Sequence, residues 1–120
     1  TAPLERFLRS PLAEEIRKSR SVLREYRFTL LMDARDYDPA AAAGEEILLQ
    51  GVVDCCFETL EGITVVDFKT DRLAPGEEPQ RAEEYRPQLA AYSRALEEIT
   101  GKPVIRRCLW FFALDQAVDV

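Results

Sequence analysis

The sequence predicts an α/β protein in which a mixed central β-sheet is flanked by helices. Apolar residues recur at helical spacing in residues 3–19 and again in residues 81–100. Between them, residues 51–69 contain two strand-like segments joined by a short turn, and residues 104–114 form an apolar run typical of a buried strand. The order helix, strand, hairpin, helix, strand implies one sheet covered by helices.

Length and composition limit the possible function classes. The chain has 120 residues, of which 47% are hydrophobic and 32% charged, as expected for one globular domain. No apolar run approaches the ~20 residues that a membrane span needs. The formal charge of −6 argues against a free-standing nucleic-acid binder, unless neighbouring domains deliver the DNA. Because the chain begins with Thr1 and shows no signal peptide, we expect a fragment of a larger protein.

The first half of the chain is predicted as a broken helix followed by a strand and a loop. Ser10 and Pro11 interrupt the helical pattern, with Ser10 as N-cap and Pro11 at the first position of a second helix. Residues 25–32 are predicted as a strand, residues 36–44 as a loop, and strand pairing resumes at residue 47.

Charged residues interrupt the strand-forming segment at residues 51–69. The turn falls at residues 60–62, and the exceptions to the apolar pattern are Asp54, Asp67 and Lys69. Since side chains alternate along a strand, Asp67 and Lys69 share one face of the second arm.

The turn decides whether Asp54 joins that face. A two-residue loop at residues 60–61 pairs Asp54 with Asp67, and one at residues 61–62 pairs it with Lys69. A three-residue loop separates them unless a bulge restores the register. Two facing carboxylates repel each other, which favours a cation between them.

The second half of the chain is a loop, a helix and a strand. Residues 70–80 form an exposed connection, and the helix at residues 81–100 ends before Gly101 and Pro103. Gln88 lies one turn before Tyr92 on the face of that helix, and Pro87 implies a kink or a delayed start. Residues beyond 115 show no informative pattern.

Cysteine and histidine usage excludes several kinds of site. Three cysteines, two of them adjacent, form neither a disulfide framework nor a zinc motif, so we interpret them as small buried hydrophobes. The chain has no histidine, which excludes a histidine-containing triad within it.

Two carboxylates and a lysine on adjacent strands are the groups needed to hydrolyse a phosphodiester with Mg²⁺. Gly51-x-x-Asp54, then Asp67-x-Lys69, then Gln88-x-x-x-Tyr92 resembles the pattern of the RecB-type nucleases in the PD-(D/E)XK superfamily. Within that group, residues 45–115 are similar to the C-terminal nuclease domains of AddA helicase–nuclease subunits. The resemblance implies a restriction-endonuclease-like fold and a single nuclease domain over residues 1–120.

The resemblance also assigns roles to residues. Asp54, Asp67 and the backbone carbonyl of Phe68 are implied to bind Mg²⁺, for which Mn²⁺ or Ca²⁺ can substitute in binding, and Lys69 is implied to be the catalytic lysine. The implied activity is exonuclease cleavage of single-stranded DNA during recombinational repair of double-strand breaks. The implied partners are DNA, the ATP-binding helicase part of the same chain and an AddB-like subunit, in the bacterial cytoplasm.

Other residues have weaker assignments. Gln88 and Tyr92 are implied to line the site from the helix and to contact DNA or position the lysine, whereas composition alone favours Tyr92 as a core aromatic residue on an apolar stripe. Glu25 matches a less constant acidic position of the group. Arg72, in the loop beyond Lys69, either contacts a phosphate or is simply solvated.

The sequence departs from the family pattern at one ligand. The group usually carries a metal-binding histidine on a helix upstream of the hairpin, so this helix either precedes Thr1 or is lacking. The AddB and Cas4 relatives hold an iron–sulfur cluster with four cysteines, which the three cysteines here do not match. The alternatives to a nuclease are a non-catalytic domain that guides DNA and a protein-interaction module with an ordinary surface ion pair.

Overall fold

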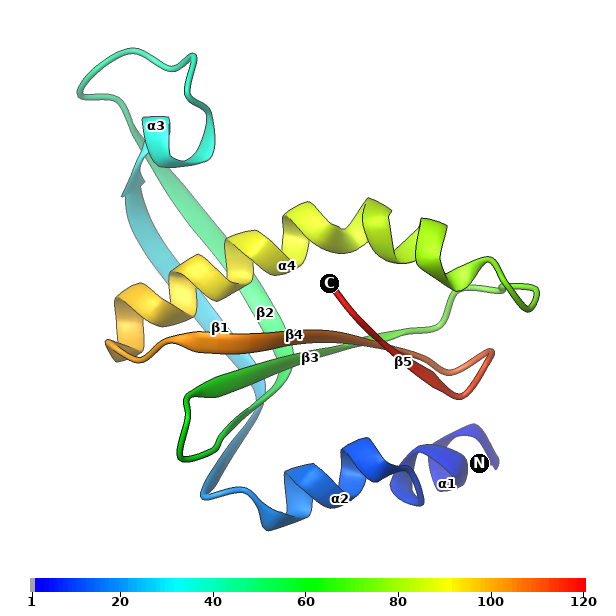
Figure 1. The fold of residues 1–120 in the computed structure, drawn as a ribbon. Coiled ribbons are helices and arrows are strands. Elements are labelled where there is room, and N and C mark those ends of the chain that lie inside the picture. Colours follow the sequence, from blue (N-terminus) through cyan, green and yellow to red (C-terminus); the bar gives the residue numbers. More distant parts are fainter. Residues whose placement is uncertain (1) are drawn as a thin grey trace.

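The fold is a five-stranded mixed sheet with helices on both faces, which confirms the predicted class (Figure 1). The computed structural model describes residues 2–120, except for the side chains of residues 36 and 37. Along the chain lie α1 (Ala2–Leu8), α2 (Pro11–Lys18), β1 (Ser21–Asp33), α3 (Ala34–Tyr37), β2 (Glu46–Glu58), β3 (Ile63–Lys69), α4 (Glu78–Thr100), β4 (Val104–Phe111) and β5 (Gln116–Asp119). Among these described residues, no helix is long and apolar enough to cross a membrane.

The strands lie in the sheet in the order in which they occur in the chain. β1, β2 and β3 are antiparallel neighbours, β4 runs parallel to β3, and β5 is antiparallel to β4. Helix α4 covers one face of the sheet and connects the two parallel strands, whereas α1 and α2 lie against the other face (Figure 1). The site expected at the end of β3 is therefore bordered by helices on both sides.

Two hydrophobic cores fill these layers. The α4-side core contains Val65 and Leu109 of the sheet, packed against Leu89 and Leu96 of α4. The α2-side core contains Val66 and Cys108 with Phe7 and other residues of the first two helices. The alternation predicted along β3 is thus confirmed, and β4 follows the same pattern, because neighbouring residues of each strand pack into opposite cores.

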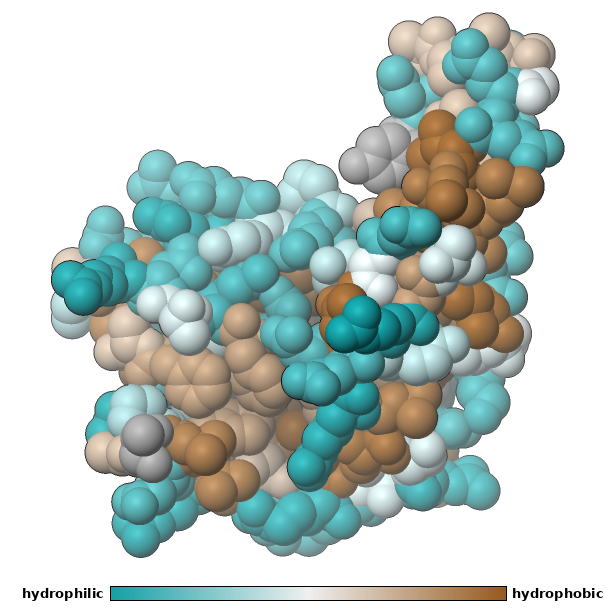
Figure 2. Space-filling view, turned by 180° about the vertical axis from the view of Figure 1, so that it is seen from behind, coloured by the Kyte–Doolittle hydropathy of each residue, from teal (hydrophilic) through white to brown (hydrophobic). Residues whose placement is uncertain are grey.

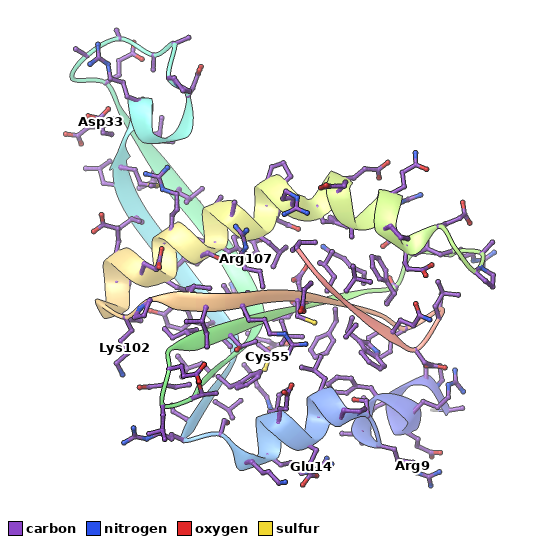
Figure 3. The ribbon with its side chains drawn as sticks, viewed as in Figure 1. Arg9, Glu14, Asp33, Cys55, Lys102 and Arg107 are labelled. Carbon is purple, nitrogen blue, oxygen red and sulfur yellow. The ribbon has the colours of Figure 1, made fainter. Side chains whose placement is uncertain are left out.

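The cysteines are buried and free, as predicted. Cys55 lies between the sheet and α2 (Figure 3). Burial raises the pKa of Cys56 to about 11 and that of Cys108 to about 12, so both thiols stay protonated at neutral pH.

The first strand and the first helices also follow the sequence closely, with one difference. The Ser10 side chain accepts a hydrogen bond from the Ala13 amide at 3.1 Å, so α2 starts at the predicted cap. The predicted start of the strand at Glu25 was wrong, since β1 begins at Ser21. Glu25 has a φ of 49°, and this irregular backbone interrupts the alternation that marks a strand in the sequence.

The alternation of side chains along β1 and β2 is interrupted at Glu25 and Asp54, which lie opposite each other. Tyr26 and Val53 pack on the α4-side core, whereas Cys55, only two residues from Val53, packs on the α2-side core. The β1–β2 ladder pairs Arg24 with Cys55 and Tyr26 with Val53, and skips the pair between them. The irregular pair therefore frees Asp54 from the ladder.

Beyond this pair, β1 and β2 continue as an arm, residues 29–50, that projects from the body (Figure 1). Apolar atoms run along the arm in Figure 2. Leu31 and Leu48, which are register partners, are 61% and 58% exposed.

The later elements differ from prediction at their ends. Helix α4 begins at Glu78 and contains Pro87, which therefore does not delay the helix start. Pro87 is exposed, so water can satisfy the carbonyl that loses its helical partner. The final apolar run ends as a strand at Phe111, and the uninformative tail forms β5 by pairing with β4.

We expect Gly51→Ala to destabilise the chain by about 1–3 kcal/mol, because overpacking forces neighbouring rings to move. A Cβ at residue 51 would lie 2.8 Å from Cε1 of Tyr92 and 2.9 Å from Cζ of Phe28. Urea unfolding measures the loss. If the clash causes the loss, the Gly51→Ala, Phe28→Leu double variant should lose less stability than the sum of the losses of the two single variants. Strict additivity would contradict this explanation.

Candidate active site

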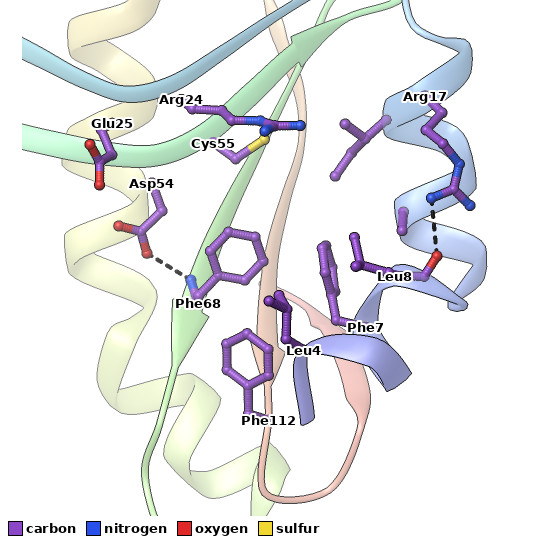
Figure 4. Close-up of a pocket in the computed structure, with 12 residues that line it drawn as sticks. Leu4, Phe7, Leu8, Arg17, Arg24, Glu25, Asp54, Cys55, Phe68 and Phe112 are labelled. Carbon is purple, nitrogen blue, oxygen red and sulfur yellow. Dashed lines mark hydrogen bonds between the residues drawn. The ribbon is translucent and has the colours of Figure 1, made fainter. Parts of the chain in front are cut away.

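Asp54 lies where β2 and β3 separate. The register is that of the two-residue loop at residues 60–61. In it, Glu58 pairs with Ile63, and Cys55 pairs with Val66 as the last pair before the site. Continued by one residue, this register sets Asp54 against Asp67. Asp54 Oδ2 instead accepts a hydrogen bond from the Phe68 amide at 2.8 Å (Figure 4). A side-chain oxygen thus takes the place of a ladder carbonyl, and the carboxylate sits in the opening between the strands.

Asp67 is the most buried acid of the site, with 5% of its surface exposed. Its carboxyl group lies beside that of Asp54, close enough for the two acids to influence each other's charge. The pKa of Asp67 is raised to about 6, mainly by burial and then by the hydrogen bond and negative charge of Asp54, whereas Lys69 lowers it. The structure therefore brings both predicted acids together in an electrostatically unfavourable pair.

Lys69 connects this pair to α4. Its Nζ lies 2.5 Å from Asp67 Oδ2, and it donates a hydrogen bond to Gln88 Oε1 at 3.1 Å. Gln88 in turn donates to the Tyr92 hydroxyl at 3.2 Å. The Tyr92 ring packs edge-on against Phe28, with ring centroids 5.6 Å apart. Tyr92 is therefore both a half-buried packing residue and the last member of a hydrogen-bonded chain that begins at Asp67.

Glu25 lines the same pocket as Asp54. This pocket, of about 550 Å³, has apolar walls from α1, α2 and Phe68, and the carboxyl groups of Glu25 and Asp54 project from neighbouring strands at its edge (Figure 4). Glu25 also has the positive φ of a strained backbone, a feature that is more frequent at functional sites.

Arg72 stays apart from the other predicted site residues. It is exposed in the connection after β3, and within residues 2–120 no hydrogen bond or ion pair joins it to them. Its proposed contact with a phosphate remains a prediction.

Two residues that sequence reasoning did not assign also border the site. The face of the Tyr85 ring lies against the Lys69 ammonium group, and the Tyr85 hydroxyl donates a hydrogen bond to Asp71. The available signal was spacing, because Tyr85 precedes Gln88 by three residues on α4 and Asp71 follows Lys69 by two.

Comparison with known proteins is consistent with this geometry. The family model of the PD-(D/E)XK nuclease superfamily matches residues 2–118. The chain belongs to this superfamily. It is 44% identical over 115 residues to an ATP-dependent helicase/nuclease subunit of Acetivibrio thermocellus, covering 92% of this chain and 9% of that protein. The protein of the same name from Bacillus cereus is 39% identical over 123 residues, covering 95% of this chain and 10% of the relative. The chain thus spans about a tenth of the length of these relatives.

PD-(D/E)XK nucleases generally use divalent metal ions, which makes the donor set of this site important. In the described part of the chain, no three residues among Asp, Glu, His and Cys are grouped closely enough to hold a metal. Mg²⁺, however, usually keeps several water molecules and binds through one or two carboxylates. Asp54 and Asp67 supply this donor set, and a cation between them would remove their repulsion. The residues therefore fit a hydrated Mg²⁺, with fewer protein ligands than a closed metal site has.

We expect Asp67→Asn to stabilise the metal-free chain at pH 7.5 by about 2 kcal/mol. Because the folded-state pKa of Asp67, about 6, exceeds its ordinary value of 3.8, ionising this acid costs stability as the pH rises. The gain of the variant should therefore be small near pH 4 and develop fully above pH 6. Urea unfolding at several pH values, with chelator present, measures it.

The matched control is Asp115→Asn, since Asp115 is an exposed acid that pairs with Arg6. Asp115→Asn should show no such gain in stability. An Asp67→Asn variant less stable than the wild type at pH 7.5 would contradict the assignment of Asp67 as a destabilising acid.

Proposed function

We propose that this chain is a Mg²⁺-dependent DNA nuclease domain that cuts single strands supplied by an attached helicase. The observation that supports this most is the Asp54–Asp67 pair, with Lys69 joined to it, at the point where β2 and β3 separate. A buried acid such as Asp67, whose pKa is raised in part by a neighbouring carboxylate, is hard to explain as a packing device.

In this proposal, Asp54, Asp67 and the Phe68 carbonyl hold the ion. When bound, Mg²⁺ supplies an activated water and offsets negative charge on the phosphate and the leaving oxygen. Lys69 places a compact positive charge beside the same phosphate, where it stabilises the charge that develops in the transition state. Its two hydrogen-bonding and ionic partners hold it at the end of β3 rather than in solvent.

The surrounding residues have supporting roles in the proposal. Gln88 orients Lys69, and Tyr92 orients Gln88. Glu25 is an accessory acid at the pocket edge, and Arg72 contacts a phosphate from the loop. None of these residues needs to bind the ion directly, so their loss should reduce cleavage less than loss of Asp67.

The relatives suggest the biological setting. Their name combines helicase and nuclease activities in one polypeptide, and this chain matches about a tenth of their length. Because a domain with a net charge of −6 repels DNA, delivery of the DNA by other parts of a complex would favour its access to the site. We therefore propose exonuclease action in recombinational repair of double-strand breaks in the bacterial cytoplasm. The partners in this proposal are the remaining helicase chain and an AddB-like subunit.

We expect Asp67→Ala and Lys69→Ala each to lower cleavage of single-stranded DNA at least about a hundredfold, since the first removes a ligand of the ion and the second removes the positive charge beside the reacting phosphate. Cleavage of end-labelled DNA by the full helicase–nuclease with Mg²⁺ or Mn²⁺ measures this. Lys102→Ala is the matched control, because Lys102 forms an exposed ion pair with Glu58. Full cleavage by both site variants would point instead to a non-catalytic, DNA-guiding domain.

We also expect Mn²⁺ or Ca²⁺ to raise the melting temperature of the chain by about 5 °C at tenfold excess over Kd, because the ion binds the folded state. Differential scanning fluorimetry with and without the ion measures the shift. Asp54→Asn and Asp67→Asn should each abolish it, whereas Asp119→Asn, at an exposed acid of β5, should preserve it. A shift that survives loss of both site acids would place the ion elsewhere.

A further inference from the structure

Lys69 has a third partner besides Asp67 and Gln88. Its ammonium nitrogen lies 3.9 Å from the centroid of the Tyr85 ring, well within the range of a cation–π interaction. The Lys69 side chain is only 14% exposed, so little water competes for this attraction. The lysine is thus held by a carboxylate, an amide oxygen and an aromatic face.

The Tyr85 ring is itself held in a fixed orientation. Its hydroxyl donates to the Asp71 carboxylate, with distances of 2.8 Å and 3.0 Å to the two oxygens. Arg81, one turn earlier on α4, donates to Asp71 at 2.8 Å and compensates its charge. Burial and the Asp71 hydrogen bond raise the pKa of Tyr85, so the phenol remains a donor. Donation to a carboxylate makes the ring richer in electrons, which strengthens its attraction for a cation.

Unlike the carboxylate of Asp67, the face of the Tyr85 ring can keep its contact with Lys69 when a metal ion is bound. A divalent ion bound by Asp54 and Asp67 would compete with Lys69 for the same carboxylate, whereas it would not compete for an uncharged ring. The ring also accepts no directional hydrogen bond, so the ammonium hydrogens stay available for a phosphate. Loss of the ion pair to a metal would therefore leave the lysine beside Tyr85 and Gln88.

We propose that Tyr85, oriented by Asp71 and Arg81, is a positioning residue that keeps Lys69 at the cleavage site when Asp67 binds a metal. The consequence for cleavage rests on the proposed nuclease function, whereas the contact between ammonium and ring does not. The competing explanation is that Tyr85 only packs, since it is half-buried against the α4-side core.

Nuclear magnetic resonance tests the contact directly. The chain has three lysines, so labelling lysine with ¹³C at Cε gives three resolvable signals. The other two lysines pair with Glu14 and Glu58, and within residues 2–120 neither of them has a described contact with an aromatic ring. The ring current of Tyr85 should place the Lys69 ε protons upfield of both, and the signal is assigned by its absence in Lys69→Arg.

Three variants separate positioning from packing. Tyr85→Phe keeps the ring and should retain most of the upfield shift, Tyr85→Leu should lose it, and Asp71→Asn should reduce it. Tyr26→Leu is the matched control, because Tyr26 is also half-buried against the α4-side core and should leave the shift unchanged. If Tyr85→Leu does not fold, the wild-type shift and its reduction in Asp71→Asn still decide the question.

Cleavage kinetics in the full helicase–nuclease complete the test. Tyr85→Leu should lower kcat roughly ten- to a hundredfold with little change in KM, because a misplaced lysine weakens transition-state stabilisation more than binding. Tyr85→Phe should recover most of kcat. A wild type that cleaves no DNA would refute the proposed function and leave the resonance result standing. Absence of an upfield signal, or a shift and kcat unchanged in folded Tyr85→Leu, would overturn the positioning role.

Discussion

Two facing carboxylates are the constraint on which the rest of the site depends. Asp54 and Asp67 lie close together, and the unfavourable effect of this proximity contributes to the raised pKa of Asp67, the buried member of the pair. Both acids are held in place, because the Phe68 amide donates a hydrogen bond to Asp54 and the Lys69 ammonium forms an ion pair with Asp67. A fold that maintains such a pair is prepared for a cation, with the binding energy of the ion offsetting the repulsion.

Residues of both the sheet and α4 hold this arrangement in place. The irregular backbone at Glu25 turns the β1–β2 pair over and releases Asp54 from its ladder position. Gly51, three residues earlier, leaves room for Tyr92, whose ring fills the space that a Cβ would occupy. Helix α4 then carries Gln88 to the end of β3. Residues far from the ion thus matter because they place the strand ends and the lysine, not because they touch the reacting groups.

Much of this arrangement could be predicted from the sequence, and the failures have physical causes. The period of two along β3 predicted the shared face of Asp67 and Lys69, because each side of that strand packs into its own core and the alternation is therefore regular. The opening between β2 and β3 could not be predicted, since it depends on a tertiary hydrogen bond from Phe68 to Asp54. Strand β5 escaped prediction because it is stabilised by pairing with β4, not by an apolar pattern of its own.

Anomalous scattering from Mn²⁺ in a crystal of the chain tests the central claim most directly, because it locates the ion without reference to activity. We expect one strong peak within about 2.6 Å of carboxylate oxygens of both Asp54 and Asp67. If the ion binds elsewhere, or is absent at a saturating Mn²⁺ concentration, the result would contradict the claim.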